Sequence, residues 1–251
     1  MSEAKRALVA ALAGVAIWGG AVASAEITQR DGVRVLVTGE MTPTKLPRDA
    51  AAPVAVSVAG RIIPTEPGRL PQLTKVAIAL NSHGNVETGG IPTCRIGQIS
   101  PSTTAGALEA CGPALVGEGH FSADVKLPEQ SPFPSAGKLL AFNGRINGKP
   151  AILAHVYGSR PLPTSYVMPF EIRSQGGGTY GTVLESSLPN ATGEWGYVTG
   201  LSLAFRRSYL SATCPAPKGF HKVGFPLLRA TFGFKGGLSL AATLNRSCSV
   251  R

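Results

Sequence analysis

Alternation of apolar and polar residues near the C-terminus constrains the fold of this chain more than any other feature. Every second residue of two neighbouring segments is apolar: Ala230, Phe232 and Phe234, then Leu238, Leu240, Ala242 and Leu244. The intervening Lys235-Gly236-Gly237 is typical of a tight turn. A period of two indicates a strand with one buried face, so this stretch predicts a half-buried antiparallel hairpin.

Similar short runs recur along most of the chain, and glycine (31 residues) and proline (20 residues) separate them. Asn147-Gly148 joins two such runs and predicts a tight hairpin, because a two-residue turn needs positive φ angles. One helix is expected over 103–111, with Ser102 as its cap and Gly112-Pro113 as its end. We therefore expect an all-β protein: an antiparallel β-sandwich, or two packed β-sandwich-like modules, with one short helix.

The N-terminal residues have the pattern of a secretory signal peptide. Lys5 and Arg6 precede an apolar run from Ala7 to Trp18, and Ala23-Ser24-Ala25 is a small-residue cleavage signal. We predict a signal peptide over 1–25 and an exported β domain over 26–251, with a subdivision near 160–165 as the alternative to a single domain. The expected location is secreted, periplasmic or in the cell envelope.

Four cysteines follow the predicted cleavage point, and four cysteines allow three connectivities. We favour Cys94–Cys111 and Cys214–Cys248, because each pair encloses one compact segment. Zinc binding would need closely spaced ligand pairs such as C-x-x-C, which the sequence lacks. Structural disulfides in an oxidising compartment are therefore the expectation.

Positive charge dominates the C-terminal region. The chain has 24 Lys and Arg against 14 Asp and Glu, and no acidic residue follows Glu194. Such a region attracts polyanions. The candidate anion-binding residues are Arg206, Arg207, Lys218, Lys222 and Lys235. The expected partners are anionic polysaccharide or envelope polymer, with nucleic acid disfavoured after export. A solvated face that keeps the protein soluble is the alternative.

Four aromatic residues form a second candidate set: Trp195, Tyr197, Tyr180 and Tyr209. Exposed on a sheet, such rings stack on sugar faces and form a carbohydrate-binding platform. Buried, they are ordinary core residues, which is the commoner role of aromatic side chains. The exposure or burial of these rings therefore decides between a sugar-binding platform and a core role.

No motif points to catalysis, a metal or a cofactor. Both Gly-Leu-Ser-Leu-Ala copies lie in alternating runs, so their serines are expected on a polar strand face and not on a nucleophile elbow. His155 lies in an apolar run and is expected to be buried and hydrogen-bonded. The carboxylates Glu171, Glu185 and Glu194 have no glycosidase spacing. We expect no catalytic residue, no metal site and no cofactor.

Several segments of the chain are similar to a set of exported bacterial proteins. They are ACGPALVG at 110–117, LAFNG at 140–144, ILAHVYG at 152–158, GTYGTV at 178–183, WGYVT at 195–199, and YLSA at 209–212, which leads to Cys214-Pro215. The resemblance covers roughly residues 70–251. It implies export and an all-β fold, and it carries no known activity, cofactor or site residue.

Three functions follow as expectations. The first is a non-catalytic exported protein that binds anionic envelope or extracellular material through its basic C-terminal region. The second is a carbohydrate-binding or carbohydrate-active protein that uses the aromatic set. The third is a structural surface protein. Salt-sensitive binding to polyanions is expected of the first alone.

Overall fold

The computed structural model describes residues 25–66, 70–125, 131, 133–159, 163–188 and 196–251. The strands are β1 (Glu26–Arg30), β2 (Val33–Thr42), β3 (Lys45–Leu46), β4 (Ala52–Pro64), β5 (Leu73–Asn81), β6 (Gly84–Val86), β7 (Leu115–Val125), β8 (Phe133–Ile146), β9 (Lys149–Gly158), β10 (Thr164–Ser174), β11 (Tyr180–Ser187), β12 (Gly196–Ala212), β13 (Lys222–Phe234) and β14 (Ser239–Val250). The helical elements are α1 (Ile96–Ile99), α2 (Thr104–Cys111) and the 3₁₀ turn η1 (Gly112–Ala114).

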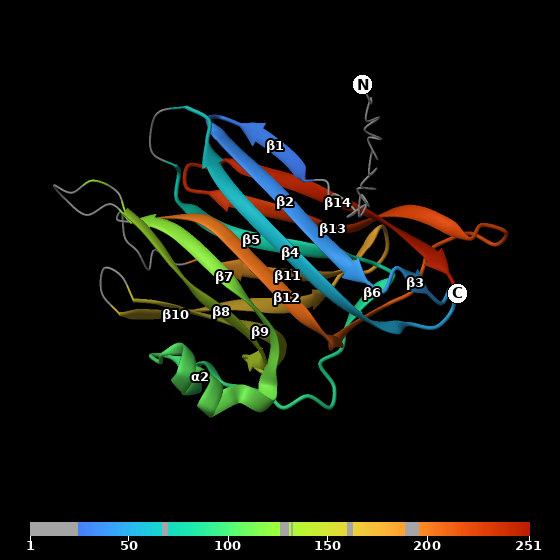
Figure 1. Cartoon of the computed structure of the whole chain (residues 1–251), viewed down its shortest axis with the longest axis horizontal. Coiled ribbons are helices and arrows are strands. Elements are labelled where there is room, and N and C mark those ends of the chain that lie inside the picture. Colours follow the sequence, from blue (N-terminus) through green and yellow to red (C-terminus); the bar gives the residue numbers. More distant parts are fainter. Residues whose placement is uncertain (1–24, 67–69, 126–130, 132, 160–162, 189–195) are drawn as a thin grey trace, which may run out of the picture.

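The strands form one continuous sheet. Thirteen follow one another in the order β1-β2-β4-β12-β7-β8-β9-β10-β11-β5-β13-β14-β3, and β6 pairs with β12 beside this path. The sheet is mixed, because β3 pairs parallel to β14 while the other neighbours in the path are antiparallel. Figure 1 shows how the sheet curls, with β2, β4 and β12 crossing in front of β5, β11 and β13. The result is a curled half-barrel.

The expected all-β class is confirmed, but the architecture is a curled mixed sheet and not clearly the two-sheet sandwich that the sequence predicts. The 17-residue strand β12 is irregular at two points. Its pairing with β4 shifts register between Phe205 and Leu210, and its pairing with β7 shifts between Val198 and Gly200. Such irregularities bend a strand and increase its twist. β9 and β10 pair with each other on either side of residues 159–163, so the sheet continues across that point.

The two ends of the sheet approach each other where β14 lies against β2. Arg246 Nε and Nη2 donate to the carbonyl oxygen of Gly39 at 2.8 and 2.6 Å. A Cβ atom on Gly39 would stand 2.9 Å from Leu244 Cδ2 and 2.5 Å from the Ser57 carbonyl oxygen. A residue without a side chain is therefore required at this crossing.

The concave face of the half-barrel is apolar. Alternate residues of the strands point inward, including Val37, Val76, Leu184 and Phe232, which are all buried. They surround a cavity of about 80 Å³. Because ligand pockets usually begin at roughly 300 Å³, this cavity is better described as a gap in the core packing.

A helical layer covers part of the convex face. Figure 1 shows α2 beneath the strands, and Ile99, Ala107 and Cys111 pack there against Leu140 and Leu153. β9 is consequently buried on both faces from Ala151 to Val156, which explains its unbroken apolar run.

The expected helix forms, with one change at its start. Thr103, and not Ser102, caps α2, and its hydroxyl accepts from the Gly106 N–H at 3.1 Å. Ser102 instead provides the carbonyl that His155 binds.

Candidate functional site

Three segments that are distant in sequence meet at one end of the sheet, at the right of Figure 1. They are β3, the connection between β12 and β13, and the last residues of β14. Ser249 of β14 lies opposite Lys45 of β3 on one side and Lys222 of β13 on the other. Side chains of residues that lie opposite each other share a face, so the two lysines flank Ser249, with their Cα atoms roughly 10 Å apart by strand spacing.

We call this group the basic end: Lys45, Arg48, Lys218, Lys222 and Arg251. Four of the five side chains are exposed, and Arg48 is half-buried. Asp49 carries the one acidic side chain within residues 43–51, 213–222 and 247–251, which the structure describes in full. The local side chains therefore carry a strong excess of positive charge.

A dense set of contacts holds the basic end in place. The disulfide Cys214–Cys248, with its Cα atoms 5.8 Å apart, ties the connection before β13 to β14. The Cys214 N–H donates to the Pro47 carbonyl at 2.9 Å, and the Arg251 N–H donates to the Leu46 carbonyl at 3.0 Å. These bonds fix the positions from which the cations project.

The predicted anion-binding residues do not form one cluster. Lys218 and Lys222 belong to the basic end. Lys235 follows the opposite end of the 13-residue strand β13, roughly 40 Å away along the strand. Arg206 lies 3.6 Å from the Glu118 carboxylate on β7, and Arg207 Nε donates to the Pro53 carbonyl at 3.2 Å.

The aromatic set is also divided. Tyr209 is completely buried, and its ring stacks on Phe205 with the centroids 5.9 Å apart. Burial raises the pKa of its phenol well above the ordinary value. Tyr197 and Tyr180 are half-buried on β12 and β11. Trp195 lies outside the described residues. Tyr209 is therefore a core residue, and sugar stacking by it is ruled out.

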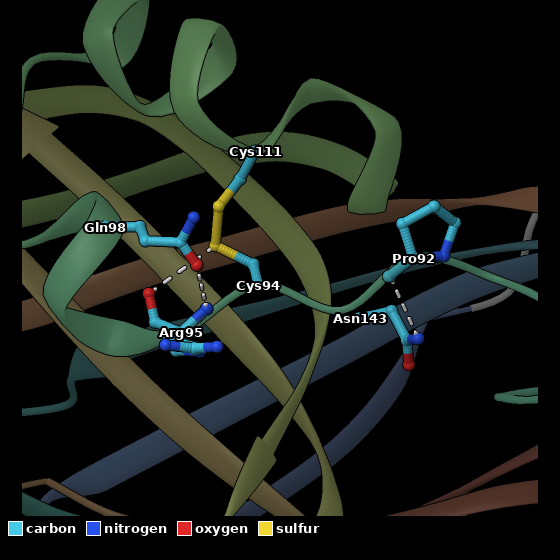
Figure 2. The surroundings of a disulfide bond; sticks show 6 residues. All are labelled: Pro92, Cys94, Arg95, Gln98, Cys111 and Asn143. Atoms are coloured by element: carbon cyan, nitrogen blue, oxygen red, sulfur yellow. Dashed lines mark hydrogen bonds between the residues drawn. A yellow bond between two sulfur atoms is a disulfide. The ribbon is translucent and has the colours of Figure 1, made fainter.

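Both predicted disulfides are present, and the described residues contain no free cysteine. Figure 2 shows the Cys94–Cys111 bond, which joins the segment before α1 to the end of α2. Beside it, Asn143 Nδ2 donates to the carbonyls of Ile91 and Pro92 at 3.1 and 3.2 Å. The Cys94 N–H donates to the Asn143 carbonyl at 2.8 Å. This disulfide therefore stabilises the covering layer and not the basic end.

A shallow groove of about 700 Å³ crosses the convex face over β2, β4, β12 and β7. Small residues form its floor, among them Ser57 and Ala204, while Glu118 and Lys138 line one side. A hydrogen bond from Lys138 holds the pKa of the Glu118 carboxyl below its usual range. Glu118 and Lys138 therefore form an ion pair at the side of the groove.

His155 is buried, as expected. Its Nε2 lies 3.0 Å from the Ser102 carbonyl, to which it can only donate, and burial lowers the pKa of the imidazole. Among the described residues, Nδ1 has no hydrogen-bond partner. No group of three or more His, Cys, Asp or Glu side chains that could hold a metal occurs within the described part of the chain.

The anion-binding set predicted from the sequence missed three of the five residues of the basic end: Lys45, Arg48 and Arg251. Lys45 and Arg48 lie about 200 residues before β14, and no local pattern relates them to Lys222. It also missed Phe220, whose side chain is 63% exposed between Lys218 and Lys222. The string Lys-Gly-Phe-His-Lys at 218–222 was the available signal, because an aromatic residue stands there between cations.

The predicted signal peptide lies outside the described residues, apart from its last position. Two disulfides are compatible with an extracellular or envelope location. In the described ranges, none of the helices has the length and apolar character needed to cross a membrane. Comparison with protein families, curated proteins and solved structures finds no match to this chain.

Proposed function

We propose that this protein is a non-catalytic exported binding protein whose basic end docks onto anionic material of the cell envelope. The observation that carries the proposal is the gathering of Lys45, Lys218, Lys222 and Arg251 at one end of the sheet. The backbone that carries these cations is already fixed, so binding a polyanion orders only their side chains, and the arrangement favours affinity.

Charge patterning supports the same proposal. The cations project from backbone held by a disulfide and by main-chain hydrogen bonds, and Asp49 is the one carboxylate side chain among the three described segments. An ordinary solvated surface mixes both signs of charge, as on β10 and β11, where Arg173 lies against Glu171 and Glu185. The basic end lacks such neutralising pairs within its described segments.

The test compares two double variants with the same change in net charge. Lys45→Glu/Lys222→Glu alters the basic end, and Arg229→Glu/Lys235→Glu alters exposed cations elsewhere on β13 and its turn. Binding to immobilised heparin is measured between 50 and 500 mM salt. We expect the first variant to lose at least tenfold in affinity at low salt and to show a shallower salt dependence, since each lost contact removes roughly one released counterion.

The matched variant should retain most of its affinity. Equal losses in both variants would mean that net charge, and not the basic end, governs binding. Binding of the wild-type protein that does not depend on salt would contradict the proposal itself.

A further inference from the structure

Phe220 occupies an unusual position for a large apolar side chain. It is 63% exposed at the end of a turn, in which the Phe220 N–H donates to the Pro217 carbonyl at 3.1 Å. Gly219 has a φ of +89°, which a type II turn requires at its third position. In Figure 1 the connection that carries this turn projects beyond the end of the sheet.

Contacts from two neighbouring segments, the loop after β3 and strand β14, hold the turn in this position. Arg48 Nη2 donates to the Phe220 carbonyl at 3.0 Å, and the Val250 N–H donates to the His221 carbonyl at 2.9 Å. The Cys214–Cys248 disulfide closes the base of the connection. The backbone on either side of the ring is therefore held at the end of the sheet, with the Phe220 side chain exposed.

We propose that the anionic target of the basic end is a lipid bilayer surface, and that Phe220 inserts between the headgroups. This inference rests on the proposed function and adds the identity of the surface. Cations bind the headgroups of an anionic leaflet, while an aromatic ring gains by entering the boundary between headgroups and acyl chains. Lys218 and Lys222 flank the ring in sequence, and Lys45 lies across β14 from Lys222.

An anionic polymer could bind the lysines but not the exposed ring. It offers charge to the lysines, but it contains no apolar phase into which Phe220 could transfer. The exposed ring is therefore the feature that distinguishes a bilayer from a soluble polyanion, and its removal should affect the two ligands differently.

The experiment measures binding of the intact protein to vesicles by co-sedimentation at 100 mM salt. One vesicle set contains phosphatidylcholine alone, and the other contains 30% phosphatidylglycerol. We expect binding to the anionic vesicles only. Phe220→Ser should weaken that binding at least fivefold and leave heparin binding unchanged.

Ile27→Ser provides the matched control. Ile27 is 62% exposed on β1, so this change removes a similarly exposed apolar side chain away from the basic end. It should leave vesicle binding unchanged. In a Phe220→Trp variant, we also expect anionic vesicles to shift the added indole emission to shorter wavelength, relative to the wild-type protein.

Vesicle binding that survives Phe220→Ser, or that Ile27→Ser weakens equally, would overturn insertion of the ring. Heparin binding without vesicle binding would overturn the lipid surface and leave the proposed function standing. Failure to bind either ligand would remove both proposals.

Discussion

Two disulfides close two segments of this protein, and one segment is largely buried while the other carries exposed side chains. Cys94–Cys111 fastens a helical layer over the convex face, where Ile99 and Ala107 are completely buried. Cys214–Cys248 fastens a connection that carries exposed lysines and an exposed phenylalanine. Both disulfides restrict the chain. The first holds a packed layer against the sheet, and the second holds a connection whose side chains face solvent.

Burial explains the difference. Strands β8 and β9 present Leu140, Phe142 and Leu153 outward, and an apolar convex face needs a cover. At the basic end, Leu46 and Cys248 already point inward and are buried, so the outward positions are left for Lys45, Lys222 and Ser249.

Removal of the second disulfide is expected to have the largest effect. Cys214→Ala/Cys248→Ala opens a 34-residue loop, for which the chain-entropy model assigns about 4 kcal/mol of unfolding free energy. Heparin affinity should fall as well, because the connection before β13 loses its attachment to β14. Urea unfolding and heparin binding together test this, and full retention of affinity would show that hydrogen bonds alone hold the basic end.

Removal of the first disulfide is expected to cost less and to leave binding intact. Cys94→Ala/Cys111→Ala opens a 17-residue loop, which corresponds to about 3 kcal/mol in the same model. Because α2 packs against β8, β9 and η1, away from the basic end, heparin affinity should stay within twofold of wild type at temperatures where the variant is folded. A loss of affinity equal to that of the other pair would abolish the distinction between the two regions.

Asn143→Ala tests the layer without touching its disulfide. The amide of Asn143 is buried, donates to two loop carbonyls and accepts from the Tyr209 hydroxyl at 3.4 Å. Loss of these bonds inside the protein should lower the unfolding free energy by about 2 kcal/mol. The control is Asn85→Ala on β6, where the side chain is exposed and a change below about 0.5 kcal/mol is expected in urea unfolding.

The smallest predicted effect depends on pH. Burial lowers the pKa of His155 in the folded state below its unfolded value near 6.5, so the unfolded chain binds the proton more readily. Stability is therefore complete above that value and declines as the pH falls below it, by at most about 1.4 kcal/mol per unit.

His155→Gln should flatten this part of the profile of unfolding free energy against pH. Val167 lies opposite His155 on β10, in the apolar cluster beneath the helical layer. Val167→Ala removes methyl groups from this cluster and should lower the unfolding free energy equally at every pH. If the His155→Gln profile keeps the wild-type slope between pH 7 and 5, another group is responsible for it.

Much of the local structure was readable from the sequence, because strand periodicity and turn chemistry are local properties. Phe232 and Leu240 point inward from β13 and β14 as their alternation predicts, and Asn147 and Gly148 adopt the positive φ angles that the hairpin needs. The cysteine pairs were also predicted correctly, on the ground that each pair encloses one compact segment of the sequence.

Tertiary structure alone decided which strands became neighbours and which residues share a surface. Alternation states that one face is buried, but not which strand lies alongside, so a sandwich and a curled single sheet looked alike. Tyr209 is a core residue because other parts of the fold bury it completely. Lys45 reached Lys222 only through the parallel pairing of β3 with β14, a contact across some 200 residues that no local pattern encodes.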